Sequence, residues 1–304
     1  MSAPYEVLLY YRYFSIEEPH KYVIEHRSLC EDLGLLGRIL VAREGINGTV
    51  SGLREQTQAY QESLRAKPGT GDMDFKIDPA DGHVFKKLSI KARDEIVTLG
   101  LSPTEDIDPN ETTGKYLPPK EFYEAMQDPN AVIVDARNAY ESQLGKFRNA
   151  ICPDVDSFRD LPQWIRDHRA ELEGKRILTY CTGGIRCEKF SGFLLNEGFE
   201  DVSQLHGGIV TYGRDPETQG RDFEGQCYVF DQRISVPVNT ANPSVIAHCR
   251  HCEVPIERYR NCGYTPCNLQ FFCCPECEES CGRFCSEACR ERTMALETSD
   301  LGDS

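Results

Sequence analysis

The cysteines of this chain are crowded into one short segment, which limits how that segment can fold. Ten of the fifteen cysteines lie between Cys249 and Cys289. Residues 1–7 lack the basic flank and apolar stretch of a secretory signal, so we expect a cytoplasmic protein. In a reducing compartment, crowded thiols indicate bound metal and not cross-links.

The spacing of these cysteines forms four short pairs, whose eight thiolates suffice for two closed, structural zinc sites. Because knuckles of this kind commonly pair alternately, we predict one site from the first and third pairs and another from the second and fourth. The two predicted sets are Cys249, Cys252, Cys274 and Cys277, and Cys262, Cys267, Cys285 and Cys289. The open alternative ligands are His248, His251, Cys273 and Cys281. An iron–sulfur cluster also stays open from spacing alone.

Cys181 lies outside the cluster at 249–289 and belongs to a different sequence pattern. It follows the strand-like run Arg176–Tyr180 and precedes a predicted helix over residues 188–196. The loop that begins with it consists of Cys181, Thr182, Gly183, Gly184, Ile185, Arg186 and Cys187. Backbone N–H groups of such a loop can point at the sulfur, and the helix N-terminus adds partial positive charge. Both effects favour the thiolate, so we predict that Cys181 is the reactive thiol.

The residues after Cys181 narrow its chemistry. Four residues separate it from Arg186, a shorter spacing than the phosphate cradle of cysteine phosphatases, so phosphatase chemistry is disfavoured. Cys187 has two interpretations. It is either a redox partner that resolves an oxidised or persulfidated Cys181, or a small apolar residue in the first helical turn.

The N-terminal third alternates between strand and helix patterns. Strands are predicted at 5–13, 37–42, 47–52 and 84–90, and helices at 15–33 and 54–66. The order β-α-β-β-α-β indicates a ferredoxin-like domain. The residues Gly45, Asn47 and Gly48 predict a tight turn, with contact to RNA or to another domain as the alternative.

The formal net charge of −15 argues against a general nucleic-acid binder. Four cations nevertheless fall in one strand-like stretch, namely Lys86, Lys87, Lys91 and Arg93. They form either a phosphate-contacting strip or a solvated strand face. No apolar run approaches the roughly 20 residues that a bilayer span requires, so we expect no membrane association.

These patterns divide the chain into a multidomain protein of mixed α/β and α+β class. We predict a ferredoxin-like domain over 1–100, a linker over 101–117, an α/β domain with a mostly parallel sheet over 118–230, and a Cys-rich zinc module over 231–304 with a short disordered tail. The oligomeric state is left open.

Three stretches, at 134–141, 145–150 and 206–209, resemble the signatures of rhodanese domains. Asp135 and Arg137, in the first of them, are expected to fix a loop through a charge-assisted hydrogen bond. Together with the motif at 43–49, the loop at 181–189 and the Cys-rich tail, they make the chain closely resemble the tRNA uridine(34) hydroxylases over nearly its whole length.

The resemblance implies oxygen-dependent conversion of uridine 34 of tRNA to 5-hydroxyuridine, with Cys181 as the active-site cysteine and a persulfide-type intermediate. A rhodanese sulfurtransferase carrying a persulfide on Cys181 is the alternative. For tRNA contact we name Lys189 and Arg186 near the pocket, besides the basic strip, and Tyr212 as either a base-stacking or a core residue. The sequence has no flavin or nicotinamide motif, so how oxygen is activated stays open.

Overall fold

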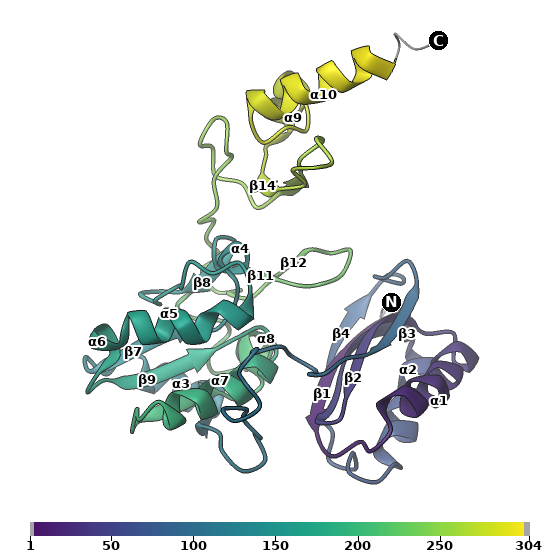
Figure 1. Ribbon diagram of the computed structural model, residues 1–304, viewed down its shortest axis with the longest axis vertical. Helices are drawn as coiled ribbons and strands as arrows, with labels where there is room; N and C mark the ends of the chain where they lie inside the picture. The colour runs from purple at the N-terminus through teal and green to yellow at the C-terminus, as the bar shows by residue number, and fades with distance from the viewer. Residues whose placement is uncertain (1–2, 301–304) are drawn as a thin grey trace.

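The computed structural model describes residues 3–300, with side chains to residue 296. It consists of two sheet-containing bodies packed side by side and a smaller Cys-rich module at one end (Figure 1). Tyr259 and Phe272 of this module pack against Leu144 of the second body.

The N-terminal body is ferredoxin-like, as predicted. Its elements are β1 (Tyr5–Tyr13), α1 (Pro19–Asp32), β2 (Leu36–Ala42), β3 (Gly45–Leu53), α2 (Arg54–Arg65), β4 (Phe75–Ala80) and β5 (Leu88–Ala92). The strand order is β4-β1-β3-β2-β5, in which β2 and β5 pair in parallel and the other neighbours are antiparallel.

Two predictions for this body need correction. The strand predicted at 84–90 does not close the fold; β4 does, and β5 extends the opposite edge. Strand β4 could not be predicted from the sequence because Asp78 and Pro79 are atypical of strands. They are tolerated here because β4 is at a sheet edge. The tight turn predicted from Gly45, Asn47 and Gly48 lies instead at Arg43 and Glu44, and β3 already begins at Gly45.

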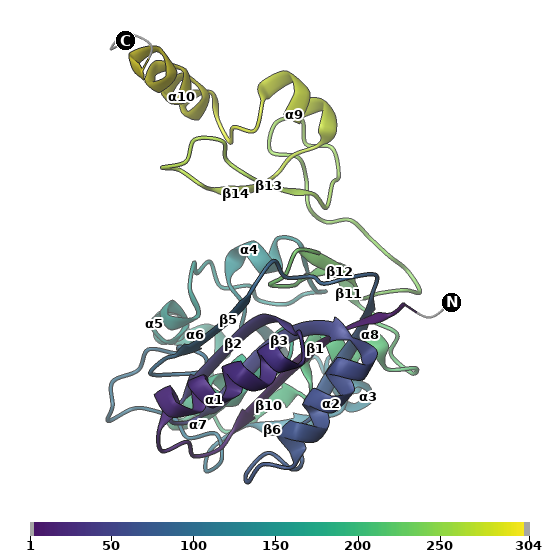
Figure 2. The same cartoon turned by 90° about the vertical axis from the view of Figure 1, so that its right-hand side faces the viewer.

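The two faces of this sheet have different roles. Alternate side chains of β1, such as Leu8 and Tyr10, pack into the core under α1 and α2. The intervening side chains, including Leu9 and Tyr11, point to the opposite face and line a cavity there. Figures 1 and 2 show that α1 and α2 cover the outer face, so that the other face of the sheet meets the second body.

The second body is α/β. Its main elements are β6 (Lys115–Leu117), α3 (Pro119–Ala125), β7 (Ala131–Asp135), α4 (Ala139–Ser142), β8 (Gly145–Phe147), α5 (Leu161–Asp167), α6 (Arg169–Leu172), β9 (Arg176–Tyr180), α7 (Ile185–Asn196), β10 (Val202–Leu205) and α8 (Gly208–Arg214). The order β6-β10-β9-β7 is parallel throughout, which confirms the predicted parallel sheet.

At both ends, this body includes residues that the sequence prediction assigns to a neighbouring segment. The segment predicted as a linker packs against the second body, because Ile107 enters its core and β6 joins its sheet. A small sheet of β8, β11 (Phe223–Tyr228) and β12 (Ser235–Pro237) continues across residue 230, where the sequence predicts a boundary. This pairing places residues up to Pro237 with the second body.

The Cys-rich module contains the antiparallel pair β13 (Tyr259–Asn261) and β14 (Gln270–Phe272), followed by α9 (Pro275–Cys281) and α10 (Glu287–Asp300). Helix α10 occupies most of the end of the chain, where a disordered tail is predicted; residues 301–304 lie outside the described residues. Among residues 3–300, no helix is both long and apolar enough to cross a membrane.

Candidate active site and metal centres

Cys181 begins the loop between the carboxyl end of β9 and α7. Strand β9 lies between β10 and β7, so the loop emerges from the middle of the sheet. The Gly184 N–H donates a hydrogen bond of 3.1 Å to the Cys181 sulfur. Gly184 caps α7 with φ +103°, a conformation that side chains rarely allow. The local geometry is therefore the N–H cradle that the sequence predicts.

The glycines are also required because the N-terminal sheet presses on this loop. A Cβ added at Gly183 would lie 3.0 Å from Leu9, and one at Gly184 would lie 2.8 Å from the Tyr11 hydroxyl oxygen. The active-site loop is thus packed directly against β1, which the sequence did not reveal.

The surroundings of Cys181 favour its thiolate. Burial by itself raises the pKa of Cys181, but a hydrogen bond from the Cys187 thiol, the charge of Arg186 and backbone N–H groups outweigh burial and lower it below the usual value. Cys187 lies in the first turn of α7, fully buried in the core, and its own pKa is raised by burial and by its hydrogen bond to Cys181. Its position fits both interpretations of Cys187.

Arg186 is fixed by a partner from a distant segment. Its guanidinium makes two contacts with the Glu141 carboxylate, at 2.5 and 2.8 Å, and both side chains are buried. The Glu141 carboxylate also accepts the Asn138 backbone N–H at the start of α4. Glu141 is not recognisable as a site residue from the sequence, because only folding brings it beside a loop more than 40 residues away.

A cavity of about 420 Å³ opens above Cys181, and both bodies line it. Cys181 is 1% exposed, so its thiol lies at the closed end. The size falls within the range of small-molecule sites. Lining residues include Leu9, Tyr11, Arg38, Asn47 and Thr49 from the N-terminal sheet, Arg93 and Ile96 beyond it, Arg159, the loop 181–186 and Phe230.

Asn47 was predicted in a tight turn, with contact to RNA or to another domain as the alternative. It lies in β3, lines the cavity and donates to the carbonyl of Ile96 at 3.0 Å. Asn47 therefore lies in a strand at the cavity that both bodies line, and its hydrogen-bond partner Ile96 belongs to the same predicted domain, 1–100.

Lys189 is not placed as predicted. Its side chain is fully buried, and its ammonium lies 2.6 Å from Glu44, 2.8 Å from Glu95 and 3.6 Å from Asp106. These carboxylates neutralise the cation and exclude a phosphate. The lysine holds α7 to the N-terminal body instead of binding tRNA, and no local pattern along the chain indicates its partners.

The predicted basic strip lies along the outer edge of the N-terminal sheet. Lys86 and Lys87 precede β5, Lys91 lies within it, and Arg93 follows it. All four side chains are exposed and line a groove of about 720 Å³ together with Arg38 of β2. Arg38, Arg93 and Phe230 line both this groove and the Cys181 cavity, so the two hollows adjoin.

Two further predictions concern the core. Arg137 makes a bidentate pair with Asp135, at 2.8 and 2.6 Å, and both are buried, which confirms the expected loop-fixing bond. Tyr212 is fully buried, with its ring edge-on to Phe147 and its hydroxyl donating to the Arg221 carbonyl. Tyr212 is therefore a core residue and is not available for base stacking.

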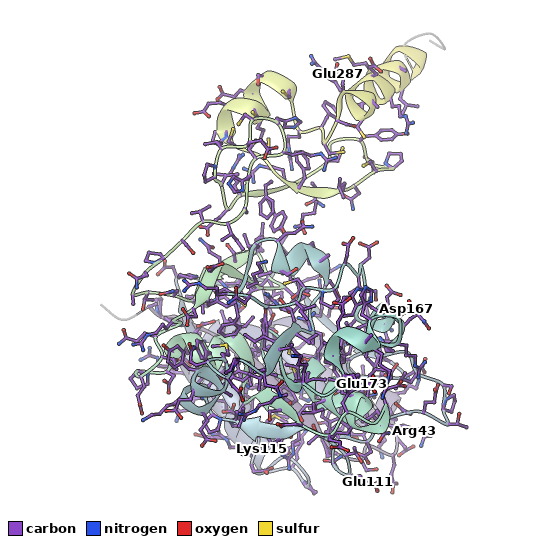
Figure 3. All side chains as sticks on the ribbon, turned by 90° about the vertical axis from the view of Figure 1, so that its left-hand side faces the viewer. Arg43, Glu111, Lys115, Asp167, Glu173 and Glu287 are labelled. Carbon is purple, nitrogen blue, oxygen red and sulfur yellow. The ribbon has the colours of Figure 1, made fainter. Side chains whose placement is uncertain are left out.

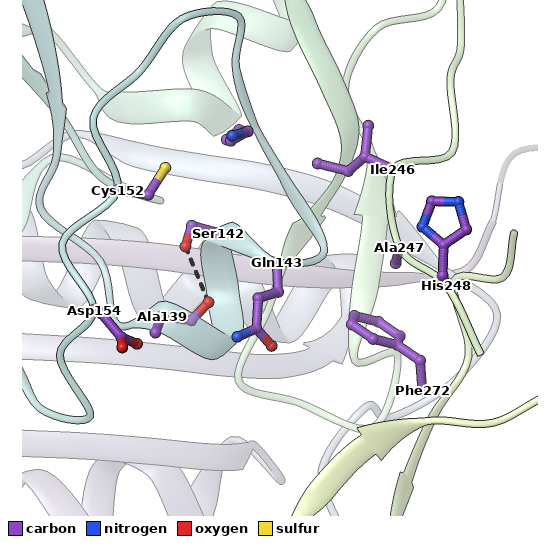
Figure 4. A pocket seen from close by; sticks show the side chains of 10 residues that line it. Ala139, Ser142, Gln143, Cys152, Asp154, Ile246, Ala247, His248 and Phe272 are labelled. Atoms are coloured by element: carbon purple, nitrogen blue, oxygen red, sulfur yellow. Dashed lines mark hydrogen bonds between the residues drawn. The ribbon is translucent and has the colours of Figure 1, made fainter. Parts of the chain in front are cut away.

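A second cavity, of about 590 Å³, lies between the α/β body and the segment leading to the Cys-rich module. Figure 4 shows Cys152 and Ser142 on one side and His248 and Phe272 on the other. Burial raises the pKa of Cys152 to about 11. A thiol that lines a cavity is therefore not activated without the cradle that Cys181 has.

The eight paired cysteines gather in two groups of four, with the predicted membership. Within each group the sulfur atoms all lie within 4.8 Å of one another. The Cys252–Cys274, Cys267–Cys285 and Cys285–Cys289 sulfurs are each 3.7 Å apart. Four sulfurs at about 2.3 Å from one zinc ion would be about 3.8 Å apart, whereas a disulfide is about 2.05 Å long. The groups therefore fit a tetrahedral metal ion.

The alternative ligands lie outside both groups. His251 faces the Phe284 carbonyl, 3.1 Å from its Nε2, and His248 is exposed. The Cys273 thiol donates to the carbonyl of Cys274, and Cys281 lies at the end of α9.

Acidic side chains are found on the side of the molecule away from the N-terminal body. In Figure 3, which views this side, Glu111, Asp167 and Glu173 are labelled on the outer surface of the α/β body. All three are exposed. The same view labels Arg43 and Lys115, which are also exposed, so this side carries charges of both signs.

The fold and the loop define a class of protein in which a rhodanese-type domain presents one activated cysteine beneath an acylphosphatase-like domain. The sequence matches the UPF0176 acylphosphatase like domain over residues 5–96, the rhodanese-like domain over 118–215 and the rhodanase C-terminal family over 224–290.

Relatives align with nearly the whole of this chain. A tRNA uridine(34) hydroxylase of Bacillus velezensis is 55% identical over 303 residues, which cover 99% of this chain and 94% of the relative. One of Bacillus licheniformis is 57% identical over 302 residues, covering 99% and 93%. The chain belongs to the tRNA uridine(34) hydroxylase family.

Proposed function

We propose that this protein hydroxylates uridine 34 of tRNA to 5-hydroxyuridine, using the Cys181 thiolate. The observation that carries the proposal is the activated thiol at the closed end of the shared cavity, in a chain that matches hydroxylases over 99% of its length. The relatives' name favours hydroxylation over the sulfurtransferase alternative.

The RNA would approach from the outer edge of the N-terminal sheet. Lys86, Lys87, Lys91 and Arg93 would contact the phosphates of the anticodon loop along the basic groove. Because this groove adjoins the cavity, a single flipped base could reach Cys181 while its neighbours stay outside.

The thiolate would add to C6 of the uracil ring, leaving C5 electron-rich. One atom of dioxygen would then be bonded to C5, and the other would leave as water with two electrons and two protons from a reductant. Loss of the C5 proton and departure of the Cys181 sulfur would restore the ring double bond. A persulfide on Cys181 is an alternative form of the nucleophile, and Arg186, fixed by Glu141, would keep either form anionic.

The metal groups would hold two zinc ions with a structural role, because each ion would have all four positions filled by thiolates. Zinc would stabilise the fold of the Cys-rich module and take no part in the reaction. We further propose that the protein acts in the cytoplasm, and that the divisions at 1–100, 101–117, 118–230 and 231–304 describe its domains, with two exceptions. Segment 101–117 and the β11–β12 hairpin both pack with the second body.

Nucleoside mass spectrometry of tRNA from cells with and without the gene tests the function. Loss of 5-hydroxyuridine, restored by the wild-type gene, supports hydroxylation. Loss of a thiolated nucleoside with unchanged 5-hydroxyuridine would overturn the proposal in favour of sulfur transfer.

A further inference from the structure

Phe230 is an exposed aromatic residue at the meeting point of the two hollows. Its side chain is 45% exposed, although large apolar side chains tend to be buried. It lines both the Cys181 cavity and the basic groove. Nothing in the cysteine chemistry or in the phosphate contacts accounts for this ring.

The segment that carries Phe230 is the hairpin between β11 and β12, which reaches from the α/β body toward the N-terminal sheet (Figure 1). The Val229 N–H donates to the Ile234 carbonyl at 2.8 Å and closes the hairpin. The Gln232 N–H donates to the Val84 carbonyl at 3.0 Å, and Arg233 lies 3.3 Å from Asp78. The tip is therefore attached to both bodies, and the ring is held in place.

The hairpin also contains an unfavourable backbone conformation. Ile234 has φ +66°, in a region that β-branched residues avoid. Such strain persists only where surrounding contacts impose it, and it is concentrated at functional sites. Here the Ile234 N–H donates to the Asp231 carbonyl at 3.0 Å, and the adjacent Gln232 and Arg233 contact the N-terminal body.

The neighbours of the ring suit a nucleobase. The Arg186 guanidinium lies 6.0 Å from the Phe230 ring centroid, and Tyr228 meets the ring edge-on at 5.2 Å. Asp231, the adjacent carboxylate, is paired with Arg233 at 2.7 Å and is not left free to repel a phosphate.

The charges around Phe230 indicate which kind of ligand the groove would bind. Arg38, Lys86, Lys87, Lys91 and Arg93 line the groove beside Phe230, and within residues 3–300 none of them forms an ion pair with a carboxylate. Unpaired cations grouped beside an exposed ring, in a protein with net charge −15, are complementary to single-stranded nucleic acid.

We propose that Phe230 stacks on a nucleobase of the RNA at the mouth of the Cys181 cavity, while the adjacent cations hold the phosphates. This inference rests on the proposed function, since it takes the substrate to be RNA. It assigns to Phe230 the stacking role for which the sequence suggested Tyr212.

A fluorescent ring at this position tests the contact directly. Trp164 is the single tryptophan, so Phe230→Trp in a Trp164→Phe protein reports on position 230 alone. A synthetic anticodon stem-loop RNA containing uridine 34 should quench this fluorescence. The matched control is Ile24→Trp in the same background, because Ile24 is 71% exposed on α1, behind the sheet. Equal quenching of both proteins, or of neither at saturating RNA, would overturn the proposal.

Kinetics on the full-length protein give an independent test. Phe230→Ala should raise KM for tRNA about tenfold with little change in kcat, because one stacked base is lost and Cys181 is intact. Phe230→Tyr should restore the wild-type KM. Unchanged KM in Phe230→Ala would overturn stacking even if the wild type hydroxylates tRNA. If the wild type forms no 5-hydroxyuridine, the proposed function fails, and the quenching still reports whether RNA stacks on the ring.

Discussion

The Cys181 loop and the Cys-rich module surround sulfur with similar backbone groups but with different numbers of thiols. In both, backbone N–H groups point at sulfur: Gly184 donates to Cys181 at 3.1 Å, and Cys274 donates to Cys249 at 3.4 Å. In the module, four thiols meet at each of two points, whereas at the loop the nearest groups are one thiol and one guanidinium.

The difference separates two uses of a thiolate. Four converging sulfurs provide the full coordination of a metal ion and leave no sulfur free to react. A single thiolate, stabilised by N–H groups and Arg186 and facing a cavity, remains nucleophilic. The number of thiols around a point, more than the N–H cradle, decides which use is possible.

The largest expected effect follows removal of the single thiol. Cys181→Ser should lower 5-hydroxyuridine formation by roughly a thousandfold or more, because the nucleophile is lost. The purified variant is assayed on tRNA by nucleoside mass spectrometry. Cys152→Ser is the matched control and should retain activity, since Cys152 lines the other cavity. Full activity of Cys181→Ser would show that Cys181 is not the nucleophile, so the contrast between a reactive thiol and metal-binding thiols would fail.

The next effect concerns the grouped thiols. Purified wild-type protein should contain two zinc equivalents, and Cys249→Ser and Cys262→Ser should each retain about one, because each removes a ligand from a different group. Elemental analysis measures the metal. In both variants Cys181 should still react with iodoacetamide. Zinc-free wild-type protein, prepared without oxidation, would show that grouped thiols do not bind zinc here.

The pH dependence of alkylation should distinguish two thiols outside the metal groups, Cys181 and Cys152. The pKa of Cys181 is lowered to about 6 and that of Cys152 is raised to about 11. Since only the thiolate reacts, the Cys181 rate should be nearly maximal at pH 8 and should fall as the pH drops through about 6. Cys152 should react appreciably only in alkaline solution. Peptide mass spectrometry after timed iodoacetamide labelling resolves the two sites, and coincident profiles would contradict the contrast.

A smaller effect is expected from the cation beside the single thiol. Loss of the Arg186 charge should raise the pKa of Cys181 and slow its alkylation at pH 7 about tenfold. Arg186→Gln alone would leave Glu141 as an unpaired buried charge, so the double variant Arg186→Gln, Glu141→Gln is the appropriate protein. Glu141→Gln alone is the control. An unchanged pH profile in the double variant would assign the lowered pKa to the Cys187 thiol and the N–H groups, without Arg186.

The smallest effect is expected at Cys187. Cys187→Ala removes a hydrogen bond to the Cys181 thiolate and should slow alkylation at pH 7 by about threefold, whereas Cys187→Ser retains a donor and should change it less. A large loss of multiple-turnover activity in both variants, with alkylation preserved, would instead favour the redox-partner interpretation of Cys187.

Much of the fold followed from local patterns. Strand β9 and helix α2 agree with the sequence prediction to within one residue, because apolar periodicity and a clear helix end coincide there. Strand β4 was missed because its sequence is atypical of a strand and its pairing with β1 is long-range. Cys181 and the metal cysteines were recognisable because their spacing along the chain encodes their geometry.

What the sequence by itself determined is chemistry contained within a short segment: the N–H cradle of Cys181, and the knuckles whose thiols reach a common point. The tertiary structure alone decided the partners: Glu141 beside Arg186, the three carboxylates around Lys189, the burial of Tyr212 and the exposure of Phe230 between two bodies. The physical reason is that charge pairing and burial depend on how distant segments pack. A lysine or an aromatic residue reads the same in the sequence whether packing buries it or leaves it facing the substrate.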